Sequence, residues 1–180
     1  MSPTYPGEPL SDGVILLRPW TTDDLACVEA ASRDPRIPEM TTVPGEYGEA
    51  EGRAWIERQH GRLALGEGLS LAIADVADGV ARGYVGLLLR EAAHGTAGIG
   101  YWLVPDALGG GRATRAVALL ARWALAEAGV ARVEAHVEAG NEASQRVLER
   151  AGFRREALLR SYLSFPTRRA DALVYAFLPD

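Results

Sequence analysis

The stretch from Ile99 to Thr114, IGYWLVPDALGGGRAT, constrains this chain most strongly. It reads as an apolar strand, a turn at Pro105, three glycines and the start of an amphipathic helix. Glycine lacks a Cβ, so the backbone can bend tightly and approach a ligand closely. The first N–H groups of a helix have no partner within it and suit an anion such as a diphosphate. A tight loop without a ligand is the alternative. Neither the P-loop pattern nor GxGxxG is present.

Size, charge and cysteine content narrow the class of protein. A length of 180 residues with 48% hydrophobic side chains is enough for one domain with a substantial core. The net charge of -5 argues against a nonspecific nucleic-acid binder. Cys27 is the only cysteine, which excludes an intramolecular disulfide and a cysteine-built metal site. The three histidines are far apart in sequence, so we expect no metal.

The beginning of the chain and its hydropathy bear on location. The first thirteen residues, MSPTYPGEPLSDG, lack the basic start and apolar run of a signal peptide. No apolar stretch is long enough to span a bilayer. We therefore expect a soluble, cytoplasmic protein with neither nucleic acid nor a membrane as a partner.

Periodicity predicts a mixed α/β domain over residues 14–180, preceded by an extended or partly disordered arm at 1–13. The proline-rich segment 34–44 is expected to be a loop between two helices. The expected helices are at about 22–32, 49–65, 112–128 and 142–152, and the expected strands are at 14–18, 69–75, 82–90, 96–104, 133–138, 153–162 and 172–178.

Two stretches, YWLVPDALGGGRATRAVALLARWAL and VEAHVEAGNEASQRVLERAGFRREALLRSYL, resemble the GNAT N-acetyltransferases, in particular their RimJ/RimL-type branch. The resemblance is strongest over residues 96–162. The first family motif, Q/RxxGxG/A, falls on Leu108, Gly111 and Ala113, with Leu108 in place of the usual Gln or Arg. The second, NxxSxxxxxxxGF, is complete and begins at Asn141.

The resemblance implies a fold and an activity. The fold is a mostly antiparallel central sheet of about seven strands with a splayed parallel pair, flanked by about four helices. The activity is transfer of an acetyl group from acetyl-CoA to a primary amine, a protein N-terminus or a small molecule, by direct attack in a ternary complex. The alternatives are a non-catalytic acyl-CoA-binding regulator and an acyltransferase that uses another donor such as succinyl-CoA. A homodimer is also open, because dimers are frequent in the family.

The family also implies which residues contact the coenzyme. Backbone groups at the splay contact the pantetheine arm, N–H groups of the glycine loop contact the pyrophosphate, and the side chain of the motif asparagine anchors a pantetheine amide. These positions are Leu103, Val104, Gly109, Gly110, Gly111, Arg112, Ala113, Thr114, Asn141 and Ser144. Asn141 could instead be only a helix cap, and Arg112 could only begin a helix.

Acetyl transfer to an amine needs a general base and a proton for the departing thiolate. Ser144 resembles the family hydroxyl that protonates the thiolate, with an ordinary first-turn serine as the alternative. Gly98 stands where relatives often carry a base. His136 is the preferred candidate, with Glu134 beside it on the same strand face, because a free imidazole titrates near pH 6.5. A solvent-facing surface is the alternative for both.

Other conspicuous residues have simpler explanations. Cys27 is expected to be a small packed side chain rather than a nucleophile, because it lies among apolar residues of the first helix. The tryptophans Trp55, Trp102 and Trp123 are expected in the core or in cleft walls. Tyr162 lies in the closing hairpin, where similar enzymes border the acceptor, although exposed turn residues are the simpler interpretation.

Overall fold

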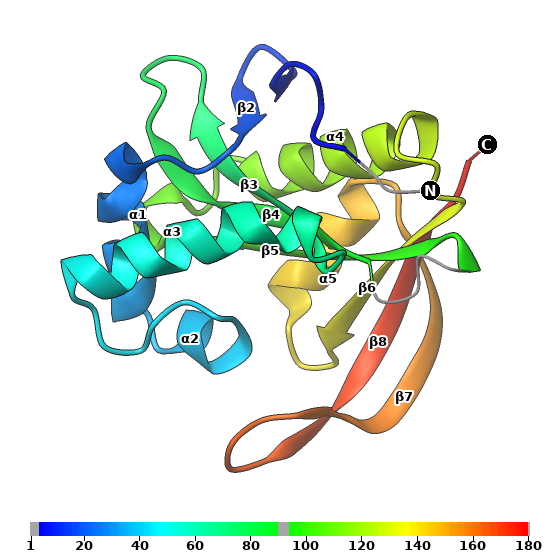
Figure 1. Cartoon of the computed structure of the whole chain (residues 1–180). Coiled ribbons are helices and arrows are strands. Elements are labelled where there is room, and N and C mark those ends of the chain that lie inside the picture. Colours follow the sequence, from blue (N-terminus) through cyan, green and yellow to red (C-terminus); the bar gives the residue numbers. More distant parts are fainter. Residues whose placement is uncertain (1–3, 90–93, 180) are drawn as a thin grey trace.

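One eight-stranded sheet organises the chain in the computed structural model, which describes residues 4–89 and 94–179 (Figure 1). Its order is β1-β2-β3-β4-β5-β6-β8-β7, and every neighbouring pair is antiparallel except β5 and β6. The strands are β1 (Leu10–Ser11), β2 (Ile15–Arg18), β3 (Gly68–Asp75), β4 (Ala81–Leu88), β5 (Thr96–Leu103), β6 (Arg132–Glu138), β7 (Arg154–Ser164) and β8 (Arg169–Phe177).

The parallel pair separates partway along its length. Strands β5 and β6 are paired from Thr96 with Arg132 to Gly98 with Glu134. Beyond that point β5 continues to Leu103 and β6 to Glu138 without pairing to each other. The two strands therefore splay apart toward their carboxyl ends, as the resemblance implied.

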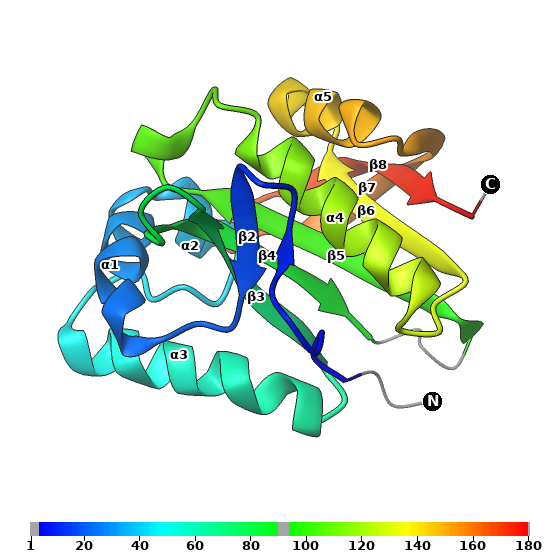
Figure 2. The ribbon, with the colours of Figure 1, turned by 90° about the horizontal axis from the view of Figure 1, so that it is seen from above.

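Helices cover both faces of the sheet (Figure 2). They are α1 (Leu25–Arg33), α2 (Arg36–Met40), α3 (Glu49–Ala64), α4 (Arg112–Ala126) and α5 (Glu142–Arg150). Helix α4 packs across β2, β4, β5 and β6 and contacts α5, whereas α3 packs on β3 and α1 on β4. The apolar side of α4 supplies residues spaced three and four apart, as expected for a helix lying on a sheet.

An aromatic cluster fills the core on the α1 and α3 side. Trp20 and Trp55 meet edge to face with ring centroids 5.0 Å apart, and Trp102 stacks on Tyr84 at 6.0 Å. Trp123 is also buried, in the core under α4. The expectation that Trp55, Trp102 and Trp123 are core residues is confirmed.

The number of helices differs from the prediction because of α2. The segment 34–44, expected to be a loop, contains this five-residue helix, so there are five helices rather than about four. Pro35 precedes α2 and Pro38 is its third residue, where the N–H group has no partner within the helix in any case. The nearly buried carboxylate of Asp34 accepts hydrogen bonds from the Arg36 backbone N–H and side chain, which fixes the start.

The number of strands differs because of β1, a two-residue strand inside the segment expected as an arm. Leu10 and Ser11 pair with Leu17 and Leu16 of β2, which raises the number of strands from about seven to eight. Residues 1–3 of the expected arm and Arg90 of the expected strand 82–90 lie outside the described residues. Within the described ranges, none of the helices has the length and apolar character needed to cross a membrane.

Truncating the core under α4 should destabilise the fold. Leu120 is fully buried, so Leu120→Ala is expected to lower the free energy of unfolding by about 2–5 kcal/mol through lost apolar burial and a residual cavity. Leu65, which is 72% exposed, provides the matched control. Leu65→Ala should change the free energy of unfolding by less than about 0.5 kcal/mol. Urea unfolding of both variants measures the difference, and equal losses would contradict the assignment of this core.

Candidate functional site

The glycine loop joins the splayed end of β5 to the start of α4. After a single 3₁₀ turn at Pro105–Ala107, the backbone reaches Gly109 with φ 85° and Gly111 with φ 73°. Residues with side chains rarely adopt this left-handed conformation, so glycine is required at both positions. Gly111 is also the N-cap of α4 and has no side chain with which to cap the helix.

The N–H groups of this loop are open. Among the described residues, no backbone carbonyl accepts a hydrogen bond from the N–H groups of residues 109–114, and no side chain caps α4. Gly109, Gly110 and Gly111 are exposed at the surface. Unpaired donors at the positive end of a fifteen-residue helix are suited to binding an anion. The loop geometry therefore fits the pyrophosphate role implied for residues 109–114.

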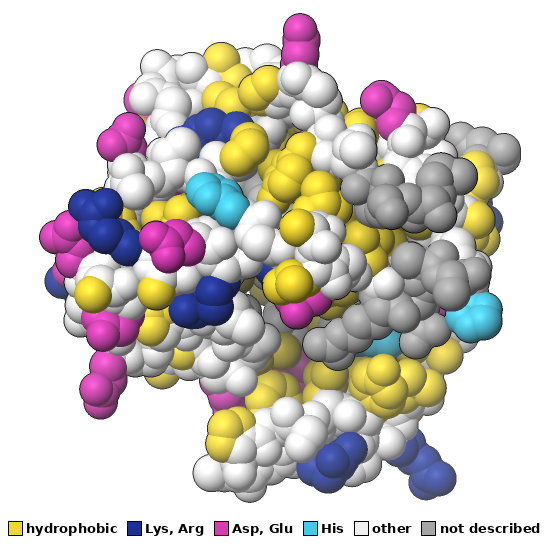
Figure 3. Space-filling view, viewed as in Figure 1, with side chains coloured by type: hydrophobic (Ala, Val, Ile, Leu, Met, Phe, Trp, Pro, Cys, Tyr) yellow, Lys and Arg dark blue, Asp and Glu magenta, His cyan; other side chains and the backbone are white. Residues whose placement is uncertain are grey.

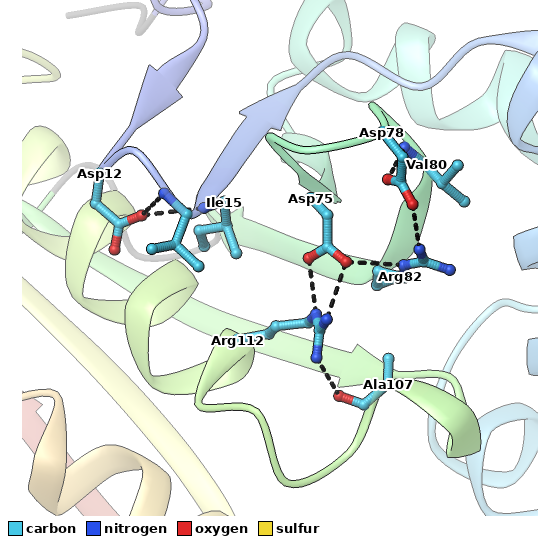
Figure 4. Close-up of polar contacts among 9 residues, drawn as sticks. Asp12, Ile15, Asp75, Asp78, Val80, Arg82, Ala107 and Arg112 are labelled. Atoms are coloured by element: carbon cyan, nitrogen blue, oxygen red, sulfur yellow. Dashed lines mark hydrogen bonds and ion pairs between the residues drawn. The ribbon is translucent and has the colours of Figure 1, made fainter.

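The side chain of Arg112 turns away from the loop opening toward β3 (Figure 4). Arg112 is the first residue of α4, and its Nε and Nη2 donate to the two carboxylate oxygens of Asp75 at 2.8 and 2.9 Å. The hydrogen bond from Arg112 is the main cause that lowers the pKa of the Asp75 carboxyl. The sequence left open whether Arg112 contacts a phosphate or only begins a helix. In the structure its guanidinium is paired with Asp75.

Backbone groups at the end of β5 differ from the prediction at Val104. The Val104 N–H donates to the carbonyl of Arg82 at 3.0 Å, and its own carbonyl accepts from Ala107 at 3.0 Å, so neither group is free for a coenzyme. Donors and acceptors alternate sides along an antiparallel strand. Because Val104 faces β4, the backbone groups of Tyr101 and Leu103 face the splay instead. Leu103 therefore remains a candidate for the implied backbone contact, and Tyr101 is a better candidate than Val104.

Asn141 and Ser144 lie together at the start of α5. The Asn141 Oδ1 accepts a hydrogen bond from the Ser144 backbone N–H at 3.0 Å, so Asn141 caps the helix as predicted. The Ser144 hydroxyl lies 2.5 Å from the hydroxyl of Tyr101, which also donates to the Ser144 carbonyl at 3.2 Å. Burial raises the pKa of Tyr101 to about 12, so this phenol keeps its proton and can serve as a donor to Ser144.

His136 and Glu134 lie on the opposite face of β6 from the buried residues Val133 and Ala135, which confirms the expected alternation. The His136 ring meets the ring of Tyr162 edge to face at 5.0 Å, and its side chain is 33% exposed. Its Nε2 is 3.9 Å from a Glu134 carboxylate oxygen. The other oxygen of Glu134 accepts a hydrogen bond from Arg132 Nε at 2.5 Å. Glu134 is thus committed to an arginine, whereas His136 contacts the Tyr162 ring and lies at a longer distance from Glu134.

A bulge in the β7–β8 hairpin places Tyr162 beside His136. The pairing shifts between Leu159 and Leu163, and Ser161 within this irregularity has φ 52°. Asp171 on β8 accepts a hydrogen bond from the Ser161 backbone N–H at 2.7 Å and stabilises that conformation. Bulges re-aim neighbouring side chains, and here the irregularity turns Tyr162 toward β6.

The His136 face opens between β5, β6 and the hairpin. A Cβ added to Gly100 would meet nothing within 4 Å. At the hairpin tip Arg168 lies 2.5 Å from Glu138 of β6 and 3.8 Å from Glu39 of α2, and it covers the ring of Phe165. The space-filling view shows the surface hollowed between this hairpin and the body of the protein (Figure 3).

Cys27 and metal ligands are not part of this arrangement. Cys27 is 6% exposed and burial raises its pKa to about 12, so the thiol is a packed side chain, as predicted, and not a thiolate nucleophile. Over residues 4–89 and 94–179, no three His, Cys, Asp or Glu side chains are grouped to hold a metal ion.

The predicted site residues thus form two groups on opposite faces of the sheet. The glycine loop, Asn141 and Ser144 lie on the side of α4 and α5, and Glu134 and His136 lie on the other side. Two residues were missed. Tyr101 could have been placed near α5 from the alternation in the GYWL strand, because it points away from Trp102. Asp75 carried no local signal, since its partner is 37 positions along the chain.

Comparison with known proteins fits this arrangement. The family model described as "Acetyltransferase (GNAT) domain" matches residues 15–154. The chain is 36% identical over 139 residues to the probable N-acetyltransferase YjcK of Bacillus subtilis, a match that covers 75% of this chain and 76% of YjcK. The protein belongs to the GNAT acetyltransferase family.

Solved structures place the fold within the same family. RimJ of Mycobacterium smegmatis, in complex with a CoA disulfide, superposes with a TM-score of 0.84 at 28% identity, over 99% of this chain and 90% of RimJ. RimL, a ribosomal L7/L12 alpha-N-protein acetyltransferase in complex with coenzyme A, gives a TM-score of 0.82 at 18% identity, over 96% of this chain and 99% of RimL. The expected fold class and the RimJ/RimL-type resemblance are confirmed.

Replacing Gly111 by alanine tests the glycine loop, and replacing a glycine elsewhere shows how much of the effect comes from glycine replacement alone. Gly111→Ala forces alanine into the left-handed conformation and is expected to cost about 1–3 kcal/mol of stability and to weaken coenzyme A binding. Gly61→Ala is the matched control, because Gly61 lies within α3 with open space around its Cβ position. It should stabilise the protein by about 0.5–1 kcal/mol. Thermal unfolding and calorimetric titration with coenzyme A test both variants, and unchanged binding by Gly111→Ala would exclude the loop as the anion site.

Proposed function

We propose that this acetyltransferase moves the acetyl group of acetyl-CoA onto a primary amine by direct attack within a ternary complex. One observation carries the proposal: the open N–H groups of residues 109–114 lie at the end of the splayed strand β5, whose free edge leads to Ser144. Family membership gives the reaction class, and this geometry gives the protein groups that would perform it.

The described residues fit an acyl-CoA. The N–H groups of Gly109 to Thr114 would bind its diphosphate, and Leu103 and Tyr101 would offer backbone groups to the pantetheine arm. The Asn141 side chain would donate from its Nδ2 to a pantetheine carbonyl, because its Oδ1 already caps α5. A backbone N–H directed at the thioester oxygen, for which Leu103 is our candidate, would stabilise the charge that develops there.

Ser144 would supply the proton to the departing thiolate. In the transfer, the amine nitrogen bonds to the acetyl carbon, the carbon–sulfur bond breaks, and its electron pair stays on sulfur. Tyr101 has a single hydroxyl proton. When it donates that proton to Ser144 Oγ at 2.5 Å instead of to the Ser144 carbonyl, the Ser144 proton is directed elsewhere and is available to the sulfur. Tyr101 is suited to this role because its raised pKa keeps it protonated. One proton leaves the amine and one joins the sulfur, so the reaction needs no net proton.

His136 is our candidate for the base, acting directly or through water. It faces the hollow beside Tyr162, on the side of the sheet opposite Ser144, and its ring is not tied to an arginine. Glu134, the second candidate, would first have to leave Arg132. An α-amine titrates near pH 8 and lysine near 10.4, so an imidazole base suits a protein N-terminus or a weakly basic small amine better than lysine.

A thiol-release assay tests the function. We expect turnover with acetyl-CoA on peptides that carry a free α-amine, and none on the same peptides with a blocked N-terminus; small-molecule amines complete the panel. Ser144→Ala should lower kcat by about 10²-fold or more with little change in KM for acetyl-CoA. Ser11→Ala removes a hydroxyl at the far edge of the sheet and should leave kcat unchanged. Coenzyme binding without turnover on any amine would favour an acyl-CoA-binding regulator. Turnover with succinyl-CoA but not with acetyl-CoA would identify an acyltransferase that uses a different donor.

The pH dependence distinguishes the two candidate bases. His136→Asn is expected to lower kcat/KM by about 10²-fold at pH 7, and the defect should shrink above pH 9 because the acceptor then loses its proton without help. Glu134→Gln should have the smaller effect because Arg132 already occupies the carboxylate. If the pH-dependent loss appears in Glu134→Gln instead, Glu134 is the base; if it appears in neither, a water-relayed proton is the remaining route.

A further inference from the structure

A chain of ion pairs connects the β3–β4 turn to the glycine loop (Figure 4). Asp75, the last residue of β3, accepts from Arg112 through both carboxylate oxygens and from Arg82 at 3.0 Å. Arg82 in turn donates to Asp78 at 2.6 Å. The Asp75 side chain is only 13% exposed, so its charge is shielded from water and the pairing is fixed in geometry.

The guanidinium of Arg112 packs against the glycine loop, next to Gly110 and Ala107. A Cβ added to Gly110 would come within 2.4 Å of Arg112 Nη1, which shows how closely the guanidinium approaches the loop backbone. The same nitrogen donates to the carbonyl of Ala107 at 3.4 Å, on the other side of the loop. One guanidinium therefore donates to the loop at Ala107 and fills the space that a Gly110 side chain would occupy, while Asp75 accepts from its opposite edge.

We propose that Asp75 is a positioning residue for the diphosphate site. By holding Arg112 against the glycine loop, Asp75 fixes the backbone shape in which the N–H groups of residues 109–114 stay without backbone acceptors. The inference rests on the proposed coenzyme role of the loop and adds a residue 37 positions away that controls it. In this model the loop backbone binds the diphosphate, and the guanidinium of Arg112 pairs with Asp75 instead of with the coenzyme.

The alternative is that Arg112 leaves Asp75 and contacts the diphosphate directly. The two models predict opposite signs for Asp75→Asn. If Asp75 positions the loop, Asp75→Asn loosens Arg112 and weakens coenzyme A binding by about tenfold, the scale of one lost charged hydrogen bond. If Arg112 is a direct phosphate ligand, the same variant frees its charge and tightens binding.

Calorimetric titration with coenzyme A and, separately, with pantetheine provides the test. Asp75→Asn and Arg112→Gln should each weaken coenzyme A about tenfold, and the double variant should be no weaker than either, because both changes remove one interaction. Pantetheine, which lacks the diphosphate, should bind all variants equally. Arg112→Lys should recover part of the affinity, since lysine can reach Asp75 but cannot form the paired hydrogen bonds.

Arg115→Gln is the matched control. Arg115 lies one turn later in α4 and donates to Asp12 at 2.6 Å, an ion pair of the same kind that does not contact the loop (Figure 4 shows Asp12). The Arg115→Gln variant should bind coenzyme A with an affinity within twofold of that of the wild type. Thermal unfolding identifies any variant that fails to fold. If Asp75→Asn does not fold, Asp75→Glu, which keeps the charge but displaces the carboxylate by one methylene, replaces it: weaker coenzyme A binding supports the positioning role, and unchanged or tighter binding overturns it.

Three outcomes would overturn the proposal: tighter binding by Asp75→Asn, unchanged coenzyme A binding by both variants, or an equal loss for pantetheine. The measurement needs no acceptor, so it is independent of whether the amine-acetylation proposal holds. Coenzyme A binding that depends on Asp75, combined with no acetyl transfer to any amine, would preserve this inference and reject the proposed reaction.

Discussion

The separation of β5 from β6 after Gly98 and Glu134 is the constraint on which the rest of the site depends. Peptide N–H and C=O groups in a sheet interior need partners, and two strands that diverge leave theirs without the neighbour they would otherwise have. The structure keeps this opening by packing α4 across both strands and by fastening Tyr101 of β5 to Ser144 of α5. An extended ligand with its own amide groups can then take the place of a missing strand.

Sequence patterns predicted most of the fold, because its long elements are encoded locally. The apolar spacing of α4, the alternation of β6 and the cap at Asn141 each depend on a few neighbouring residues. Helix α2 was missed for the opposite reason. Three prolines within eleven residues indicate a loop unless it is known that two of them, Pro35 and Pro38, fall at the N-cap and in the first turn of a helix. Strand β1 is only two residues long and exists through its pairing with β2.

The site was less predictable where it depends on register or on distant partners. Motif spacing located the glycine loop, but whether Leu103 or Val104 presents free backbone groups depends on which of them faces β4, and adjacent residues alternate. Tyr101 and Ser144 are 43 positions apart, so only the packing of α5 beside β5 brings their hydroxyls together. Likewise, no pattern near Asp75 in the sequence predicts that an arginine from α4 donates to its carboxylate.

The placement of the two groups of residues on opposite faces has a consequence for how such a protein can diversify. The side proposed for the coenzyme offers backbone groups and a helix start, which tolerate many changes in side chains. The other side is bordered by the β7–β8 hairpin and α2, which are joined by an ion pair between Arg168 and Glu39 at 3.8 Å. Substitutions or insertions in these two surface elements can reshape the space around His136 without disturbing the glycine loop. Under the proposed assignment of the two sides, donor use can therefore stay constant within a lineage while the choice of acceptor changes.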